Sequence, residues 1–190
     1  LEARTDLDPP TRAALHAAYG DIRTSLSAHA DAADAYARAI ALLADDPAHR
    51  RDLLDYSLRR AYALSAAGRN SDAVALAEPL ITELRAATDE IAVAGLVSWT
   101  DILASAGRFD EAIRSADEVA ARAAQLPDRQ SPQARFRTLL PGWVRASAGR
   151  EQEAVPLLQQ ALAAWRDSAT PKDREYAGGG PCDDVECAAA

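Results

Sequence analysis

The stretch Ala67-Gly68-Arg69-Asn70-Ser71-Asp72-Ala73-Val74 recurs twice further along this chain of 190 residues, keeping its Ala-Gly-Arg start and its acid-Ala-aliphatic end. The two copies are Ala106-Gly107-Arg108-Phe109-Asp110-Glu111-Ala112-Ile113 and Ala148-Gly149-Arg150-Glu151-Gln152-Glu153-Ala154-Val155. Their glycines stand 39 and 42 residues apart. Self-similarity at such a period is typical of helical solenoids, in which one unit cannot bury its apolar face alone. The sequence therefore predicts a helical repeat protein and favours binding over catalysis.

Helical periodicity flanks each repeated glycine. Around Gly68, apolar residues recur at steps of three and four, at Leu54, Leu58, Ala61, Tyr62 and Leu64 before it and at Ala73, Val74, Ala77, Leu80, Ile81 and Leu84 after it. This pattern predicts a helix, a tight turn and an antiparallel second helix. Glycine suits the turn because it enters the left-handed conformation at little cost. The Ala five residues later lets the two helices approach closely.

A fourth, disguised copy precedes these three. Aligning Ala32 with Ala73 places Ser27 at the turn, 41 residues before Gly68. We therefore expect an all-α fold of four antiparallel helix pairs, in units of about 9–46, 47–88, 89–127 and 131–168. Residues 1–8 are expected to form an N-terminal lead, and 169–190 a disordered tail that contains glycine and cysteine.

Prolines mark several helix boundaries. Asp8-Pro9-Pro10 and Ser131-Pro132 each place a capping side chain before a proline, which favours a helix start. Pro79 and Pro141 instead fall inside expected helices. Because a proline in a helix removes a hydrogen bond and clashes with the preceding turn, these two positions predict a bend or a shifted boundary.

The repeat resembles the tetratricopeptide repeat family in its longer-period form, over roughly Leu7 to Asp167. The resemblance is carried by the turn glycines, by the alanines that follow them and by small residues seven positions before each turn: Gly68, Gly107, Gly149, Ala73, Ala112, Ala154, Gly20, Ala61 and Gly142, with Thr100 as the exception. The aromatic residue frequent in the family's second helix is present as Tyr36 and is replaced by Ala77, Ala116 and Leu158 in the later units. The resemblance implies a right-handed superhelical solenoid whose first helices line a concave groove.

The family's groove positions, transferred one by one, select a set of candidate binding residues. They are Asp21 and Thr24 in the first unit, Asp55, Leu58 and Tyr62 in the second, Val97 and Asp101 in the third, and Phe136, Leu139 and Trp143 in the fourth. This set would suit an extended or helical peptide with apolar and basic residues. The alternative is that these apolar side chains pack against the next helix. Some family members bind acidic chaperone C-termini through Lys, Arg and Asn in the groove, and that partner is disfavoured because the positions here carry Asp, Tyr and aliphatic residues.

No catalytic, cofactor or metal site is expected from the sequence. His16, His29 and His49 lack metal-ligand spacing, and Gly178-Gly179-Gly180 lacks the Lys-Ser/Thr of a phosphate-binding loop. Cys182 and Cys187 lie beside three acidic residues in the expected tail, which disfavours a reactive thiol. These two cysteines leave open a small disulfide loop or a weak soft-metal site, although two cysteines are only half of a zinc site.

Charge and composition narrow the partner classes. The net charge of −8 argues against nonspecific binding to nucleic acid or to an anionic membrane surface, and no apolar run is long enough for a transmembrane helix. We therefore expect a non-enzymatic, cytoplasmic scaffold that binds a protein or peptide partner. The alternative is a regulatory or sensor segment of a larger bacterial signalling protein, since serine/threonine kinases and signalling-ATPase transcription regulators resemble this arrangement. Two features agree with that alternative. Basic charge is almost all arginine, with Lys172 as the one lysine, which suggests a GC-rich bacterial source. The absence of methionine suits a trimmed chain and leaves open an N-terminal domain or targeting segment before Leu1.

Overall fold

The described part of the protein is built from helices. The computed structural model describes residues 7–44, 46–127 and 131–168, and the regular elements in these ranges are α1 (Pro9–Ser25), α2 (His29–Leu43), the 3₁₀ helix η1 (Pro47–His49), α3 (Arg50–Ala66), α4 (Asn70–Ala77), the 3₁₀ helix η2 (Glu78–Leu80), α5 (Ile81–Ala86), α6 (Glu90–Ser105), α7 (Phe109–Ala123), α8 (Pro132–Ser147) and α9 (Glu151–Ser168). The expected lead, except for Leu7 and Asp8, and the expected tail with both cysteines lie outside these ranges.

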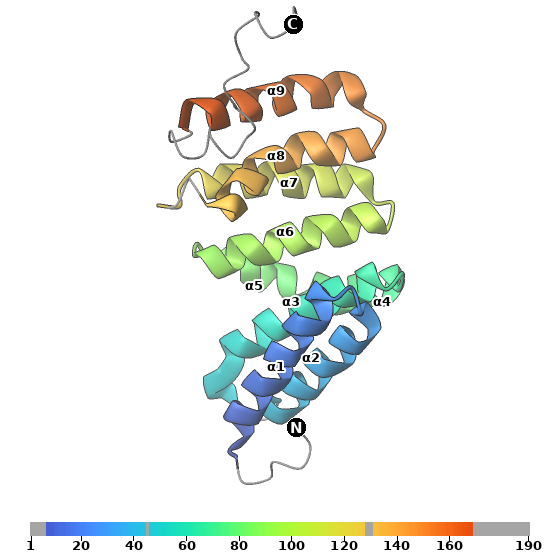
Figure 1. Cartoon of the computed structure of the whole chain (residues 1–190), viewed down its shortest axis with the longest axis vertical. Coiled ribbons are helices and arrows are strands. Elements are labelled where there is room, and N and C mark those ends of the chain that lie inside the picture. The colour runs from blue at the N-terminus through green and yellow to red at the C-terminus, as the bar shows by residue number, and fades with distance from the viewer. Residues whose placement is uncertain (1–6, 45, 128–130, 169–190) are drawn as a thin grey trace, which may run out of the picture.

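The helices form four pairs that stack along the long axis of the molecule (Figure 1). The pairs are α1 with α2, α3 with the segment from α4 to α5, α6 with α7, and α8 with α9. Each helix packs mainly on its neighbours in the chain, and the first helices α3, α6 and α8 also contact one another in that order. In Figure 1 the α1–α2 pair lies at one end of the stack and α9 at the other. The expected all-helical class and the four helix pairs are confirmed for the described ranges.

All four helix pairs turn in the same way. Ser27, Gly68, Gly107 and Gly149 have φ values of 57°, 80°, 74° and 72°, which is the left-handed region. At each turn, the N–H of this residue donates to the carbonyl oxygen three positions earlier. The N–H of the next residue donates to the carbonyl oxygen five positions before it. At Gly68 these two bonds run from Gly68 to Ser65 and from Arg69 to Leu64, both at 2.9 Å. These two bonds satisfy carbonyls left open at the end of the first helix. The sequence-based placement of the disguised turn at Ser27 is confirmed.

The helix boundaries follow the capping residues and the prolines. Asp8 accepts a hydrogen bond from the Thr11 N–H at 2.8 Å, and Ser131 accepts one from the Ala134 N–H at 3.1 Å, so both expected starts are present. Pro79 lies in η2, where the second helix of its unit is divided into α4 and α5. Pro141 instead lies within α8, which continues past it to Ser147.

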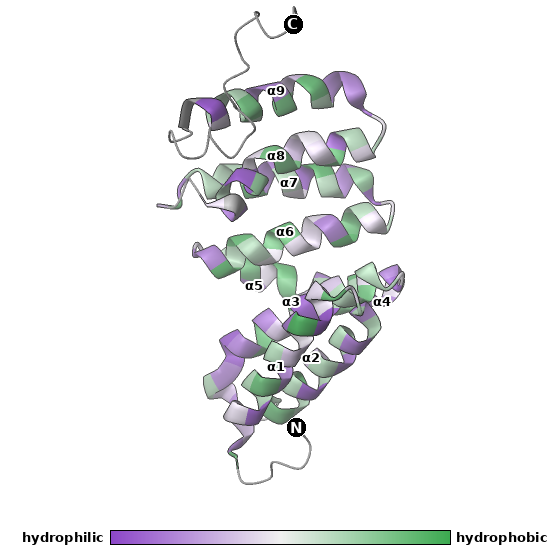
Figure 2. Cartoon of the chain, in the orientation of Figure 1, coloured by the Kyte–Doolittle hydropathy of each residue, from purple (hydrophilic) through white to green (hydrophobic). Residues whose placement is uncertain are grey.

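The interface within each pair depends on the residue seven positions before the turn. A Cβ atom at Gly20 would lie 2.7 Å from Tyr36 Cε1, and one at Gly142 would lie 2.7 Å from Leu158 Cγ. Where the second-helix partner is instead an alanine, the first helix carries a larger residue: Ala61 with Ala77, and Thr100 with Ala116, all fully buried. Thr100 also hydrogen-bonds to Ser115 Oγ of α7 at 2.8 Å. Hydrophobic and hydrophilic residues are interspersed along most helices of the stack, and α6 is largely hydrophobic (Figure 2).

The arginine of the repeated Ala-Gly-Arg motif ties successive units together. Arg108 donates to Glu78 of the preceding unit at 3.0 Å, and Arg150 pairs with Asp110 of the unit before it. Arg69 is the exception, because it pairs with Asp72 on its own helix at 2.6 Å. The motif therefore contributes a turn through its glycine and, in two of three copies, a polar contact across the unit boundary.

Candidate functional site

The first helices of the four pairs share a surface that holds two adjoining pockets. The α3 pocket has a volume of about 310 Å³ and is lined by Asp21, Thr24, Tyr36, Asp55, Leu58, Arg59, Tyr62, Ala94, Gly95 and Ser98. The α8 pocket has a volume of about 310 Å³ and is lined by Ala94, Val97, Gln133, Phe136 and Arg137. Ala94 of α6 lines both pockets, so they form one surface that runs from α1 across α3 and α6 to α8.

Seven of the ten groove residues selected from the sequence line these two pockets. Asp21, Thr24, Asp55, Leu58 and Tyr62 lie in the α3 pocket, and Val97 and Phe136 lie in the α8 pocket. Asp101, Leu139 and Trp143 line neither. Leu58 is only 3% exposed and sits against Gly95, so its side chain is mostly core, as the alternative interpretation expects. Tyr62, Phe136 and Trp143 expose about 40% of their surface, which leaves these rings open to a partner.

Arg59 is the central polar residue of the α3 pocket. Its Nη1 lies 2.7 Å from Asp21 Oδ1, and its Nη2 lies 2.9 Å from Asp55 Oδ2. The Tyr36 hydroxyl donates to Asp21 Oδ1 at 2.7 Å, and burial raises the Tyr36 pKa to about 12. Both pocket carboxylates are thus paired within the chain, which removes much of the reason to expect a basic partner at this position. Asp55 and Arg59 stand four residues apart, a spacing that favours an ion pair on a helix. The groove positions transferred from the family did not include Arg59.

Asp101 is the groove carboxylate without such pairing. Its Oδ1 atom is buried and has no hydrogen-bond partner. Desolvation by burial raises the pKa of Asp101 to about 6, well above the usual range for an aspartate. Asp101 therefore carries its negative charge above about pH 6, and a cationic partner would favour the charged form.

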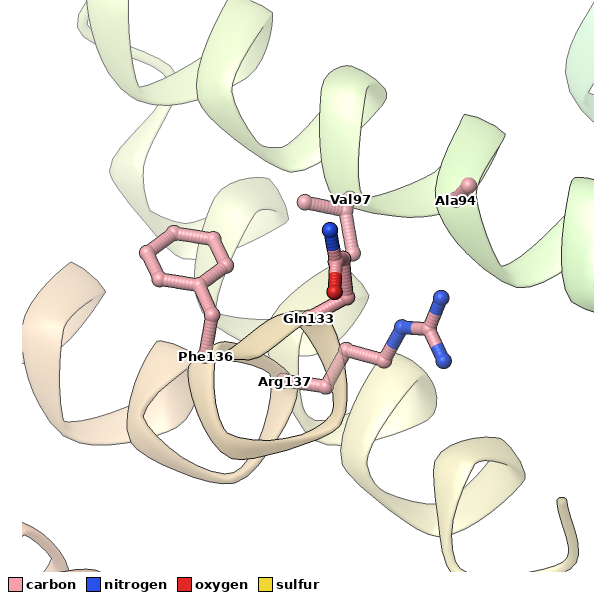
Figure 3. Close-up of a pocket in the computed structure, with 5 residues that line it drawn as sticks. All are labelled: Ala94, Val97, Gln133, Phe136 and Arg137. Carbon is pink, nitrogen blue, oxygen red and sulfur yellow. The ribbon is translucent and has the colours of Figure 1, made fainter. Parts of the chain in front are cut away.

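The α8 pocket combines an apolar wall with a buried cation (Figure 3). Val97 and Phe136 supply apolar surface, and Figure 3 shows the Phe136 ring and the Arg137 guanidinium on opposite sides of Gln133. Arg137 is only 4% exposed. Its Nη2 donates to Glu90 Oε1 at 3.0 Å, whereas its Nη1 is buried without a hydrogen-bond partner. The guanidinium offers five donors in a fork, so Nη1 can donate to a further carboxylate once neighbouring side chains move aside to expose this buried atom.

The histidines lie apart from this surface. His49 contacts Asp52 at 2.8 Å near the start of α3, and His16 is buried in α1. Within the described residues, no three His, Cys, Asp or Glu side chains gather closely enough to hold a metal ion. Among the helices of residues 7–44, 46–127 and 131–168, none has both the length and the apolar character needed to cross a membrane.

Comparison with known proteins adds no assignment. No family model, curated protein or solved structure matches the chain. Any function for this surface must therefore be argued from its own residues.

Proposed function

We propose that this chain is a non-enzymatic scaffold of the tetratricopeptide type, a right-handed superhelical solenoid that binds a protein or peptide segment along its first-helix surface. The observation that carries the proposal is the sharing of Ala94 by the α3 and α8 pockets. Because the two pockets adjoin, one extended segment can place side chains in both. The half-exposed rings of Tyr62 and Phe136 border this path and supply the kind of aromatic surface that dominates binding energy at interfaces.

The polar groups of the surface favour recognition over chemistry. Asp21 and Asp55 are held by Arg59, and Arg137 is held by Glu90. Side chains that are fixed in ion pairs in this way can orient a ligand. The remaining donor capacity of Arg137 favours a partner with a carboxylate beside an apolar side chain, the latter packed against Phe136 and Val97.

The test is selection from a random peptide library displayed on phage, followed by titration of the selected peptides. Peptides selected on the wild-type chain should bind the Tyr62→Ala/Phe136→Ala variant at least about tenfold more weakly, because truncation of buried aromatic contacts costs 1–2 kcal/mol or more. Helicity by circular dichroism should stay near wild type, as both rings are half-exposed. The Tyr62→Ala/Trp143→Ala variant tests whether the surface extends along α8.

The matched control is Val155→Ala, which truncates an exposed apolar residue of α9 away from both pockets. Peptides that lose binding to this control but not to the Tyr62→Ala/Phe136→Ala variant would place the binding surface elsewhere and contradict the proposal. Loss of helicity in the pocket variants would mean that these rings are structural. Glu90→Gln should strengthen binding of peptides with a carboxylate, since it frees Arg137 from its exposed competitor.

A further inference from the structure

The outer face of α1 is an exposed apolar stripe. Leu15, Tyr19, Ile22 and Leu26 are all exposed, and their spacing of four, three and four residues places them on one side of the helix. Polar outer faces normally close the ends of a helical stack. This end has no such face.

Some of these positions are buried in the other first helices, whereas Arg60, the equivalent of Tyr19 in α3, and the three equivalents of Leu26 are not. Five residues before the turn, Ile22 is 57% exposed, whereas its equivalents Ala63, Ile102 and Val144 are all fully buried. Eight residues before the turn, Tyr19 is exposed and its equivalent Trp99 in α6 is buried. Trp99 lines one pocket together with Ile81 of α5 in the preceding unit. The side of α1 that carries Ile22 therefore corresponds to the face that is buried in each later first helix of the described chain.

At the opposite end, α9 leaves the complementary face open. Val155, Leu162 and Trp165 each expose 39–50% of their surface, and the Arg135 guanidinium lies 5.2 Å from the centre of the Trp165 ring. Sixteen residues after the turn, the equivalents of Trp165 are Leu43, Leu84 and Ala123, which are all buried. Thirteen residues after the turn, the equivalent of Leu162 is Ile81, the residue that lies beside Trp99. The α9 stripe is thus the face that receives a following unit.

We propose that a second copy of this chain covers these faces, with the α1 stripe of one copy packed on the α9 stripe of the next. The chain carries both halves of the contact that joins its own units, so the register is specified: Tyr19 of one copy lies over Leu162 of its neighbour, as Trp99 lies beside Ile81. Such a head-to-tail contact is heterologous and prolongs the stack. This inference is independent of the groove function, because neither stripe lines the α3 or α8 pocket.

The contact is expected to be apolar. The arginine that follows the turn, which ties units together as Arg108 and Arg150, is replaced by Ala28 in the first unit. Added salt should therefore leave the association unchanged or strengthen it, in contrast to an association through ion pairs.

Sedimentation velocity from low micromolar to several hundred micromolar protein tests the proposal. The wild-type chain should show a mass that rises with concentration, at low and at high salt. Ile22→Glu and Val155→Glu each place a charge on one stripe at an exposed helical position, so both variants should fold, with wild-type circular dichroism, and remain monomeric. Leu162→Glu provides a second variant of the α9 stripe if Val155→Glu reduces helicity. Tyr62→Ala is the matched control, because it alters the groove and should associate like the wild type.

Mixing the two stripe variants gives the decisive result. Ile22→Glu retains an intact α9 face and Val155→Glu retains an intact α1 face, so the mixture should form dimers that do not grow further. A wild-type chain that stays monomeric throughout the range would overturn the proposal. It would also be overturned if Val155→Glu still self-associates, which would indicate pairing of α1 with α1, or if the mixture stays monomeric.

Discussion

Ser27 is the single non-glycine residue of the described ranges that adopts a left-handed backbone. Its φ of 57° reproduces the turn that Gly68, Gly107 and Gly149 form in the other units. The left-handed region costs an L-residue about 1–2 kcal/mol because Cβ approaches the following carbonyl oxygen. The turn of the first unit is therefore held by its helices at the expense of local strain.

Replacing this residue should stabilise the protein. Ser27→Gly is expected to raise the free energy of unfolding by about 1 kcal/mol, since the strain removed exceeds the added flexibility of the unfolded chain. Gly107→Ala is the converse substitution and should lower it by a similar amount, because a Cβ there meets no neighbouring atom and only the backbone is strained. Urea denaturation midpoints measure both changes. Equal stability of Ser27→Gly and wild type would argue against strain at this turn.

Asp101 makes the free energy of unfolding depend on pH through its protonation. Its raised pKa of about 6 means that, between the unfolded-state value of 3.8 and about 6, the folded chain binds more protons than the unfolded chain. Stability is therefore lost as the pH rises through this window, and the full penalty is present above it. Asp101→Asn should stabilise the protein by about 1–2 kcal/mol near pH 7.5, and the gain should fade towards about pH 4. Denaturation midpoints at several pH values give the comparison, with Asp34→Asn on the exposed side of α2 as the control for loss of one charge. A gain that does not change with pH would contradict this assignment.

Within each helix pair, the residues at two facing positions have complementary sizes. The residue seven before the turn and the residue nine after it combine as Gly20 with Tyr36, Ala61 with Ala77, Thr100 with Ala116 and Gly142 with Leu158. A large second-helix residue goes with glycine in the first helix, because a Cβ would meet the ring or the leucine at 2.7 Å. This exchange explains why the second and third units carry alanine at the position that Tyr36 occupies in the first.

The exchange predicts a coupled pair of substitutions. Gly142→Ala should destabilise the chain by about 1–3 kcal/mol, the usual cost of overpacking. The same substitution should cost clearly less in a Leu158→Ala background, because the pair then matches Ala61 with Ala77. A double-mutant cycle from urea denaturation measures the coupling. Strict additivity of the two changes would contradict direct contact between these positions.

At the scale of the whole molecule, most of the fold could be predicted from the repeat period. The turn residues and the small residues beside them specify four pairs, because each imposes a local geometry that the sequence displays directly. The site was only partly predictable. Arg59 reaches Asp21 across 38 residues, and Arg137 reaches Glu90 across 47, so both pairings depend on how successive units stack. The stacking also decides why Asp101, Leu139 and Trp143 line neither pocket although they occupy equivalent groove positions.

The stacking itself rests on contacts of unequal strength, as two arginines at the boundary between the third and fourth units show. Arg145 is mostly buried and makes two bonds of 2.9 Å to Asp117 of α7, and its Nη1 also donates to the Pro141 carbonyl at 3.1 Å. Arg150, in the repeated motif, pairs with Asp110, and both of these side chains are exposed.

Replacing each arginine in turn should distinguish the contribution of a buried contact to stability from that of an exposed contact, both between the third and fourth units. Arg145→Ala is expected to cost about 1–2 kcal/mol, because paired bonds and packing of its stem are lost together. Arg150→Ala should cost less than about 1 kcal/mol, as exposed pairs usually do. In about 1 M NaCl the Debye length falls to roughly 3 Å, so the effect of Arg150→Ala should vanish while most of that of Arg145→Ala persists. Urea midpoints at low and high salt give the measurement, and an equal salt dependence of the two variants would show that the boundary is held by exposed charge rather than by the buried arginine.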